Sequence, residues 1–405
     1  MVAAVRAGES LRAVARRFHV SLDTVRRWVQ HAGELRLDSV DWSDRPDGPK
    51  ASPRRTPQSV EDDVLAWRMR LRSESALGEY GAVAIREAML AAGAAGALSQ
   101  PLPTLPACPT LQPLPALPPS VRTINRILER RGLFDSQHRP RTAPPPRGWY
   151  LPDVACRSSE LDYFDVVVGL VIAGGPEVEV FNGISMHGGL VESWQTRSVN
   201  AQFVRTALPD HWRRWGLPVY AQFDNDTRFQ GPHQHADVVS SVMRVCLSLG
   251  VTPVFVPPRE PGFQAGMESF NAQWQVKVWH RFQHTDLEAV SAKSALYVGA
   301  YRARRAARIE AAPDRRAFPT DWQPDLQAHP RGKLIYIRRV SEQGQVSLLG
   351  RQFAVDLPAH RLVRCEVLLD TERIQFYRLR RREPLVQPLI GDLPYALPRR
   401  KFRCD

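Results

Sequence analysis

The feature that most constrains the fold is a set of carboxylates placed within or beside apolar, β-prone runs. Asp162 interrupts the run at 161–168, and Asp224 closes a second run that begins at Val219. Glu268 lies near the start of a helical pattern. Packing alone explains such carboxylates poorly, because burying an unpaired charge is costly. A strand, a strand end and a helix together can bring three carboxylates to one point.

Three convergent carboxylates form a candidate metal site. Their oxygens are hard ligands, and with room left for water and phosphate they suit Mg²⁺ or Mn²⁺. Two such ions activate the attacking oxygen and stabilise the leaving oxygen of an in-line phosphoryl transfer. The pattern therefore predicts Asp162, Asp224 and Glu268 as catalytic and metal-binding residues for two divalent ions.

The segments around these acids resemble the D-D-E catalytic core of insertion-sequence transposases and retroviral-type integrases. The resemblance is carried by Asp-Asn-Asp-Thr-Arg-Phe at 224–229, after a strand, and by Glu-Ser-Phe-Asn at 268–271, on a helix. The segment Asp-Tyr-Phe-Asp at 162–165 is similar to the opening of such cores. The resemblance implies Asp162 as the acid of the first strand, and leaves open whether Asp165 or Asp226 takes part.

Two departures from the family pattern stand beside this resemblance. Asp226 occupies a position where the family usually has glycine, which removes an easy positive-φ residue. The separation between Asp224 and Glu268 is also longer than usual, and an inserted loop around 230–235 accounts for the excess. Both departures support an alternative, a catalytically inactive integrase-fold protein that binds DNA without cutting it.

The charge balance points to a polyanionic partner. The formal net charge is +13 and the sequence pI is near 10.0, which favours nucleic acid. The five cysteines form no C-x-x-C pair, so a zinc site from neighbouring ligands is not expected. Arginines interrupt the N-terminal region and no apolar run is long enough for a membrane span. We expect a cytoplasmic, nucleoid-associated protein with no membrane partner.

The N-terminal 35 residues have the pattern of a helix-turn-helix. Apolar residues share one face up to Phe18, His19 and Val20 break the period, and Ser21 is a good N-cap for a second helix. The residues expected to face DNA in this second helix are Ser21, Thr24, Arg26 and Arg27. Residues 36–57 are polar and proline-containing, and are expected to be a linker.

Residues 58–134 are expected to form a second helix-turn-helix, interrupted by a proline-rich insertion at about 94–119. Its last helix begins after Ser120, and Arg122 and Asn125 are its candidate DNA contacts. A second linker, 135–152, precedes the core.

The core is expected at 153–315 with a mixed α/β, ribonuclease H-like fold, as the resemblance implies. Strands are predicted at 160–172, 177–186, 189–196, 218–224 and 251–256, with helices at 200–215, 236–249 and 285–308. Asn271 and Lys277, on the Glu268 helix, are further candidate DNA contacts. Short strands at 330–392 predict a small β-barrel, followed by a basic tail at 393–405.

The resemblance implies a DNA transposase. Water would free a 3′-OH at the end of an insertion element, and that 3′-OH would then attack target DNA. The implied partner is double-stranded DNA, both element ends and target, and the protein would act as a homo-oligomer because two ends must be paired. The sequence does not indicate whether a partner ATPase is needed.

Overall fold

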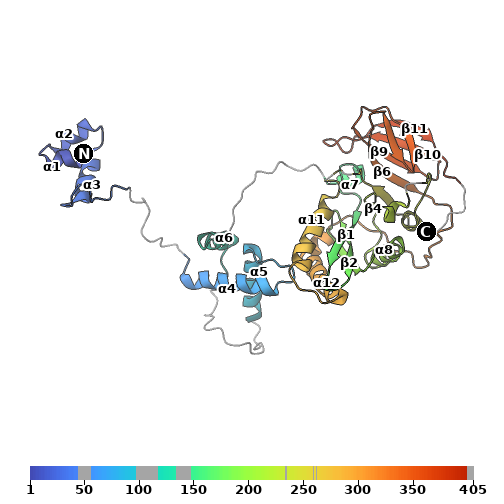
Figure 1. The fold of residues 1–405 in the computed structure, drawn as a ribbon, viewed down its shortest axis with the longest axis horizontal. Coiled ribbons are helices and arrows are strands. Elements are labelled where there is room, and N and C mark those ends of the chain that lie inside the picture. Colours follow the sequence, from blue (N-terminus) through green and yellow to red (C-terminus); the bar gives the residue numbers. More distant parts are fainter. Residues whose placement is uncertain are drawn as a thin grey trace. The chain divides into compact units, whose positions relative to one another are not determined.

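The computed structural model describes residues 1–43, 56–96, 117–133, 147–232, 235–258, 260 and 262–398. The expected proline-rich insertion, much of the two expected linkers and the end of the basic tail lie outside the described residues. The chain divides into two compact units, Met1–Val60 and Glu61–Asp405, and each is treated by itself (Figure 1). Among the described residues, no helix combines the length and apolarity needed to cross a bilayer.

The first unit contains three helices, α1 (Val2–Arg6), α2 (Leu11–Arg17) and α3 (Leu22–Ala32). Ser10 and Ser21 cap α2 and α3 by accepting hydrogen bonds from backbone N–H groups in the first turn of each helix. His19 turns the chain between these helices with a positive φ of 52°. Small apolar side chains then pack α2 against α3.

The second unit begins with another cluster of three helices, α4 (Gln58–Glu74), α5 (Ala82–Gly96) and α6 (Val121–Arg130). Val64, Ile85 and Ile124 form part of its apolar core. The buried carboxylate of Glu61 accepts hydrogen bonds from Arg130 and Arg131 on the α6 side, at 2.6 and 3.1 Å. These two ion pairs fix α4 against the end of α6, although the paired residues are far apart in sequence.

The core elements follow the predicted order closely. The strands are β1 (Leu161–Val171), β2 (Glu177–Ser185), β3 (Val191–Thr196), β4 (Tyr220–Phe223) and β5 (Thr252–Phe255). The helices are α7 (Pro152–Ala155), α8 (Ala201–Trp215), α9 (Thr227–Gln230), α10 (Ser241–Ser248), α11 (Ala265–Trp274), the π-helix η1 (Gln275–Trp279), α12 (Leu287–Arg304) and α13 (Ala306–Glu310).

The sheet is mixed, and helices cover both of its faces. Strands β1, β2 and β3 are antiparallel neighbours, while β4 and β5 run parallel to β1. Phe164 and Trp212 belong to the apolar core on the α8 side. Tyr163 and Phe270 belong to the core on the α11 and α12 side (Figure 1). This mixed α/β arrangement agrees with the ribonuclease H-like fold class expected for the core.

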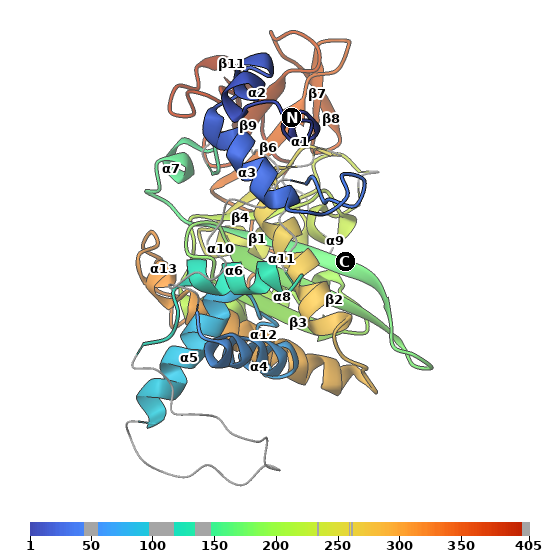
Figure 2. The same cartoon turned by 90° about the vertical axis from the view of Figure 1, so that its left-hand side faces the viewer.

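The C-terminal strands differ from the expected separate barrel. They are β6 (Lys333–Arg339), β7 (Gln345–Leu348), β8 (Arg351–Ala354), β9 (Leu362–Leu368), β10 (Arg373–Arg378) and β11 (Leu389–Pro394). Four of them continue the core sheet, which has nine strands in the order β11-β10-β9-β6-β5-β4-β1-β2-β3. The hairpin β7–β8 forms a separate two-stranded sheet that lies next to β6 (Figure 2).

The C-terminal strands join the core sheet at β5, whose outer edge would otherwise be unpaired. Its backbone pairs with β6 in parallel, Val254 opposite Ile335 and Phe255 opposite Tyr336. The middle of β6 is buried on both faces, as in a strand of a sheet covered on both sides, whereas a strand of a small isolated barrel has one face toward solvent. Short strands and turn signals predict the strands themselves but not their pairing with the core sheet through β5.

Candidate functional site

Strand geometry separates the two acids at the start of β1. Successive side chains of a strand point to opposite faces, so residues three apart, such as Asp162 and Asp165, lie on different faces. Asp165 shares its face with Tyr163 and Val167, which pack in the core beneath α11 and α12. Asp162 shares its face with Phe164, in the core beneath α8.

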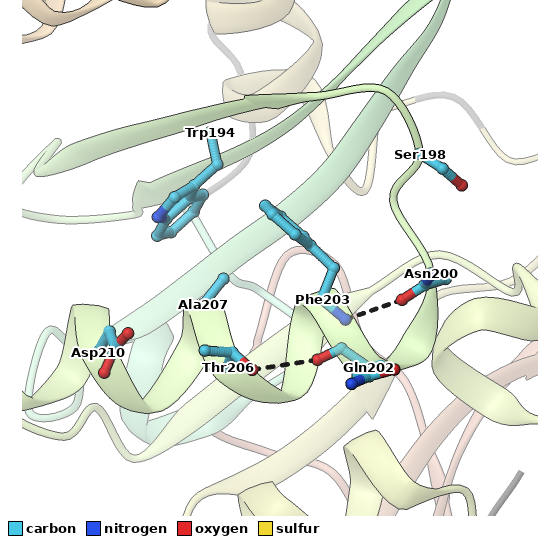
Figure 3. A pocket seen from close by; sticks show the side chains of 8 residues that line it. All are labelled: Trp194, Ser198, Asn200, Gln202, Phe203, Thr206, Ala207 and Asp210. Carbon is cyan, nitrogen blue, oxygen red and sulfur yellow. Dashed lines mark hydrogen bonds between the residues drawn. The ribbon is translucent and has the colours of Figure 1, made fainter.

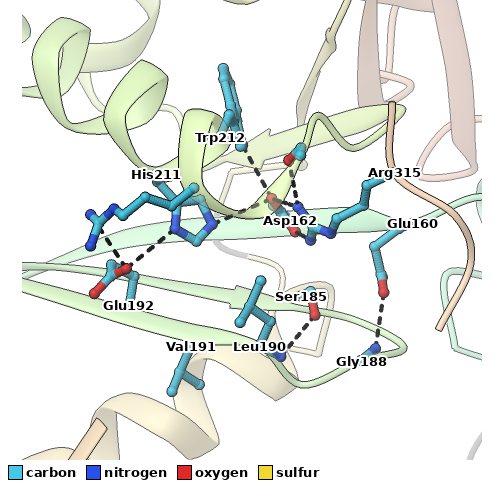
Figure 4. Close-up of polar contacts among 12 residues, drawn as sticks. Glu160, Asp162, Ser185, Gly188, Leu190, Val191, Glu192, His211, Trp212 and Arg315 are labelled. Carbon is cyan, nitrogen blue, oxygen red and sulfur yellow. Dashed lines mark hydrogen bonds and ion pairs between the residues drawn. The ribbon is translucent and has the colours of Figure 1, made fainter. Parts of the chain in front are cut away.

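Asp162 lies in a buried polar network on the α8 side (Figure 4). Its carboxylate is 1% exposed and forms a bidentate ion pair with Arg315, from the segment after α13. The indole Nε1 of Trp212 donates a third hydrogen bond to Oδ2 at 3.2 Å. Both carboxylate oxygens are thus used by protein donors, and the structure does not bring Asp162 together with Asp224 and Glu268 as the sequence had predicted.

The network continues away from Asp162 through His211. Its Nε2 lies 3.8 Å from Asp162 Oδ2, and its Nδ1 lies 3.5 Å from Glu192 Oε2 (Figure 4). Arg302 Nη2 lies 2.5 Å from the same Glu192 oxygen. Burial acts to raise the pKa of Glu192, but the contacts with His211 and Arg302 outweigh it and lower that pKa to about 2. Arg315 and Arg302 thus neutralise Asp162 and Glu192 on this side of β1, away from Asp165.

Asp165 is held on the other face by two asparagines. Asn271 Nδ2 donates to Asp165 Oδ2 at 2.8 Å, and Asn182 Nδ2 donates to Asn271 Oδ1 at 2.9 Å. Asn182 is the residue paired with Asp165 across the β1–β2 ladder. The chain Asn182–Asn271–Asp165 therefore joins two strands to α11 and sets the orientation of one carboxylate oxygen.

Asp224 follows directly after β4, which runs parallel to β1. The register pairs Tyr163 with Gln222. Asp165 and Asp224 each lie two residues further along the chain, so the same register places them opposite each other. Paired residues of parallel strands point to the same face, so these two carboxylates are neighbours. Glu268 lies on α11 one turn before Asn271. Asp224 and Glu268 also line the same pocket, which has a volume of about 520 Å³.

The electrostatics link the same three residues. Burial, the charge of Asp224 and, more weakly, that of Glu268 together raise the pKa of Asp165 to about 6, against hydrogen bonds from Val166 N and Asn271 that lower it. Burial also raises the pKa of Asp224, against a backbone hydrogen bond from Asp226 that lowers it. Val166 N donates to Asp165 Oδ1 at 2.9 Å, and Asp226 N donates to Asp224 Oδ1 at 3.0 Å. Carboxylates that repel one another and accept hydrogen bonds only from neutral groups are a donor set suited to a divalent cation.

The donor chemistry fits Mg²⁺ or Mn²⁺, whose preferred ligands are carboxylate oxygens and water. The Glu268 side chain is exposed and makes no hydrogen bond or ion pair with any part of the chain that the structure describes. Over those same residues, no three histidine, cysteine, aspartate or glutamate side chains are close enough to form a complete metal site. Metal binding by these acids is therefore a proposal, which the next section takes up.

Arg338 supports the Asp224 turn from the C-terminal part of the sheet. This buried side chain of β6 donates to Asn225 Oδ1 at 3.0 Å and to the carbonyl oxygen of Val256 at 3.2 Å. Asn225 itself donates to the same Val256 carbonyl at 2.6 Å. No sequence pattern indicated Arg338 or Asn182, because their partners lie far away in the chain and become neighbours only through the strand order.

The residues predicted to contact DNA have different environments. Ser21 caps α3 and its hydroxyl lies 2.8 Å from that of Thr24, while Arg26 and Arg27 project from the same helix. Arg122 is exposed on α6 and Asn125 is half-buried beside it. Asn271 donates a hydrogen bond to Asp165, and Lys277 donates one to the carbonyl of Gly78 at 2.8 Å. Both side chains therefore have intramolecular partners that the sequence did not predict.

A second hollow, of about 460 Å³, lies between β3 and α8 and is lined by Trp194, Phe203, Asp210 and their neighbours (Figure 3). The polar side chains there are partly used by the helix itself: Asn200 caps α8 by accepting from Phe203 N, and Thr206 donates to the carbonyl of Gln202. With one carboxylate and a position on the α8 side of the sheet, it is not part of the acidic site.

Comparison with known proteins found similarity at the level of solved structures. No protein-family model and no curated protein matches this chain. The catalytic core of BIV integrase is 16% identical, covering 34% of this chain and 80% of that one, with a TM-score of 0.26. The HTLV-2 integrase catalytic core in complex with magnesium is 11% identical, covering 34% and 82%, with a TM-score of 0.25.

A simian T-cell lymphotropic virus intasome is similar over more of the chain, 65% of this one and 90% of its own, at 13% identity and a TM-score of 0.34. These structures are integrase cores and assemblies. At such identities and TM-scores, the similarity assigns no residue, ligand or partner to this protein, and the following proposals depend on the geometry described above.

Proposed function

We propose that this protein is a divalent-metal-dependent polynucleotidyl transferase of the D-D-E type, with Asp165, Asp224 and Glu268 as its acids. The observation that carries the proposal is the placement of Asp165 and Asp224 side by side on parallel strands, beneath the helix that presents Glu268. Asp165 replaces Asp162 in this assignment, because both oxygens of Asp162 are bound by Arg315 on the opposite face.

The chain's own residues perform three tasks in this proposal. Asp165, Asp224 and Glu268 would hold Mg²⁺ or Mn²⁺, which would supply activation of the attacking oxygen and stabilisation of the leaving oxygen. Asn271, held by Asn182, and the backbone N–H of Val166 orient the Asp165 carboxylate by hydrogen bonds from neutral donors, which leave its charge unpaired. Arg338 and Asn225 hold the turn that carries Asp224. The pocket beside Asp224 and Glu268 is open to a large substrate such as a DNA strand.

The biological reaction we propose is transposition, in which a 3′ end of an insertion element is freed and then joined to target DNA. The basic net charge of +13 supports a DNA partner. The helix pair α2–α3, with Ser21, Thr24, Arg26 and Arg27, and helix α6, with Arg122 and Asn125, are the proposed contacts to the element ends. Pairing two ends requires at least two copies of the chain, so we propose a homo-oligomer on DNA.

The test is nicking of supercoiled plasmid in the presence of Mn²⁺. Wild-type protein should nick, whereas Asp165→Asn, Asp224→Asn and Glu268→Gln should each lose at least 100-fold of the rate, roughly the scale seen when an electrostatic catalytic group is removed. Glu260→Gln is the matched control, because Glu260 lines the same pocket but is ion-paired with Arg339. Its nicking should stay near the wild-type rate.

The result that would reject the proposal is equal nicking by wild type and the three variants. If the wild type is folded, binds DNA and does not nick a plasmid carrying its own element ends, the alternative of a DNA-binding protein without catalysis replaces it.

A further inference from the structure

A pocket of about 490 Å³ lies where the helical cluster α4–α6 meets the end of the helix that carries Glu268. Arg68 of α4, Tyr80 from the α4–α5 connection, Asn125 of α6 and Lys277 of η1 contribute to its lining. The acidic site does not use this pocket.

Two cations converge inside it. The guanidinium carbon of Arg68 lies 5.1 Å from the centre of the Tyr80 ring, and the ammonium of Lys277 lies 5.7 Å from the same centre. Within the described chain, neither cation has a carboxylate at ion-pair distance. The carboxylate that does line the pocket, Glu79, is paired with Arg304 at 3.6 Å.

The hydrogen bonds of both cations go to neutral groups. Arg68 donates to the carbonyls of Tyr80 and Leu133, at 3.4 and 3.0 Å, and Lys277 donates to that of Gly78, at 2.8 Å. A carbonyl accepts a hydrogen bond without cancelling the charge of its donor. Two like charges beside one ring therefore leave a positive potential in a concave, partly desolvated place, which favours an anion.

Two further features suit a tetrahedral anion. The half-buried amide of Asn125 lines the pocket and has no hydrogen-bond partner among the described residues, so it is free to donate. Gly78 leaves room for the lysine: a Cβ there would lie 2.8 Å from Lys277 Cδ. The lysine therefore reaches this place because residue 78 has no side chain.

We propose that this pocket binds one backbone phosphate of DNA, held by Arg68, Lys277 and Asn125. The inference rests on the proposed function, in which the partner is DNA, and adds a specific contact to it. Lys277 follows Glu268 on the continuous helical run of α11 and η1. A phosphate in the pocket would thus connect the α4–α6 cluster to the helix that presents a catalytic acid, and would set the distance between bound DNA end and active site.

The test is the salt dependence of binding between the full-length protein and a labelled 40-base-pair duplex without divalent ions. Each neutralised phosphate contributes about 0.9 to the slope of log K against log salt concentration. Arg68→Gln and Lys277→Gln should each lower the slope. The double variant should lower it by about 1 and not by about 2, because both cations serve one phosphate. Asn125→Ala, which removes no charge, should weaken binding about fivefold at unchanged slope.

Arg281→Gln is the matched control. Arg281 also donates to carbonyls at and just after the end of α4, those of Ser75 and Ser73 at 2.6 and 2.9 Å, but it does not line the pocket. Its slope should equal that of the wild type. An equal loss with Arg281→Gln, a wild-type slope in the double variant, or a loss of about 2 in the double variant would each overturn the phosphate site.

The nicking assay separates this proposal from the proposed function. If the variants change the salt slope as expected but the wild-type protein does not nick DNA that carries its own element ends, catalysis is rejected and the phosphate site stands. Normal nicking with no slope change would reject the phosphate site alone. No binding of DNA by the wild type at any salt concentration would reject both.

Discussion

At the scale of single residues, the two acids at the start of β1 show that the face of the strand to which a side chain points determines which partners it can reach. Asp162 and Asp165 have nearly the same sequence context, and an apolar run buried on both faces does not reveal which helix covers which face. The sequence predicted that one acid of this segment belongs to the site with Asp224 and Glu268. The structure places Asp165, and not the predicted Asp162, beside Asp224, because the buried partner of Asp162 is an arginine from the end of the core, Arg315, that no local pattern connects to it.

The raised pKa of Asp165 predicts a pH-dependent effect of Asp165→Asn on stability. The folded pKa is about 6 and the ordinary value is 3.8, so the ionised carboxylate destabilises the native state above pH 6. This penalty disappears as the pH falls through 6 towards 4. Asp165→Asn should therefore raise the free energy of unfolding by about 3 kcal/mol at pH 7.5 and by almost nothing at pH 4.

Urea unfolding in EDTA at the two pH values measures this difference, and EDTA keeps divalent cations from masking the repulsion. Asp210→Asn, at an exposed aspartate of α8, is the control and should show no such pH dependence. An equal gain for Asp165→Asn at both pH values would mean that charge repulsion is not its cause.

Asp162→Asn is expected to have the opposite effect on stability. It breaks a buried ion pair and leaves Arg315 largely buried with no carboxylate, which costs about 3–5 kcal/mol. The exposed pair of Asp210 and Arg213 is the comparison, because its loss should cost no more than about 1 kcal/mol. Denaturant unfolding of the two variants gives the answer. If Asp162→Asn were as mild as Asp210→Asn, the network in Figure 4 would not be important for stability.

At the scale of elements, the sequence predicted the order of strands and helices in the core well, because apolar runs and caps are local signals. The N-caps Ser21 and Ser120 are examples, since each accepts a hydrogen bond from the backbone N–H three residues later. The partner of β6 was not predictable in this way. Whether a strand pairs with β5 or closes a small barrel depends on residues distant in sequence, and a buried strand has the same composition in both cases.

The pairing of β6 with β5 predicts that the C-terminal part of the sheet affects the active site. Arg338→Met should remove the hydrogen bonds to Asn225 and Val256 and loosen the turn after β4. We expect the nicking rate to fall about tenfold or more, as for a misplaced catalytic group, with DNA affinity unchanged. Arg351→Gln, at an exposed ion pair with Asp237, is the control and should nick normally.

Double-mutant analysis makes the assignment to Asn225 specific. If Arg338 acts through Asn225, the variant Asn225→Ala should lose a similar part of the rate, and the double variant should lose little more than either single one. Fully additive losses would show that Arg338 supports the site by another route.

At the scale of the whole molecule, the two units predict opposite outcomes of truncation. Removing 1–55 leaves the second unit intact, so its thermal unfolding should stay cooperative and shift by only a few degrees. If α2 and α3 make the proposed DNA contacts, DNA affinity should fall at least tenfold. Removing 330–405 exposes the edge of β5 and the buried side chains of Val254 and Phe255. That truncated chain should aggregate or lose cooperative unfolding, because an apolar edge strand templates association. Circular dichroism melting and sedimentation of both chains measure these outcomes. A soluble, cooperatively folded chain ending at 329 would mean that β6 to β11 form an independent domain after all, as the sequence pattern alone had predicted.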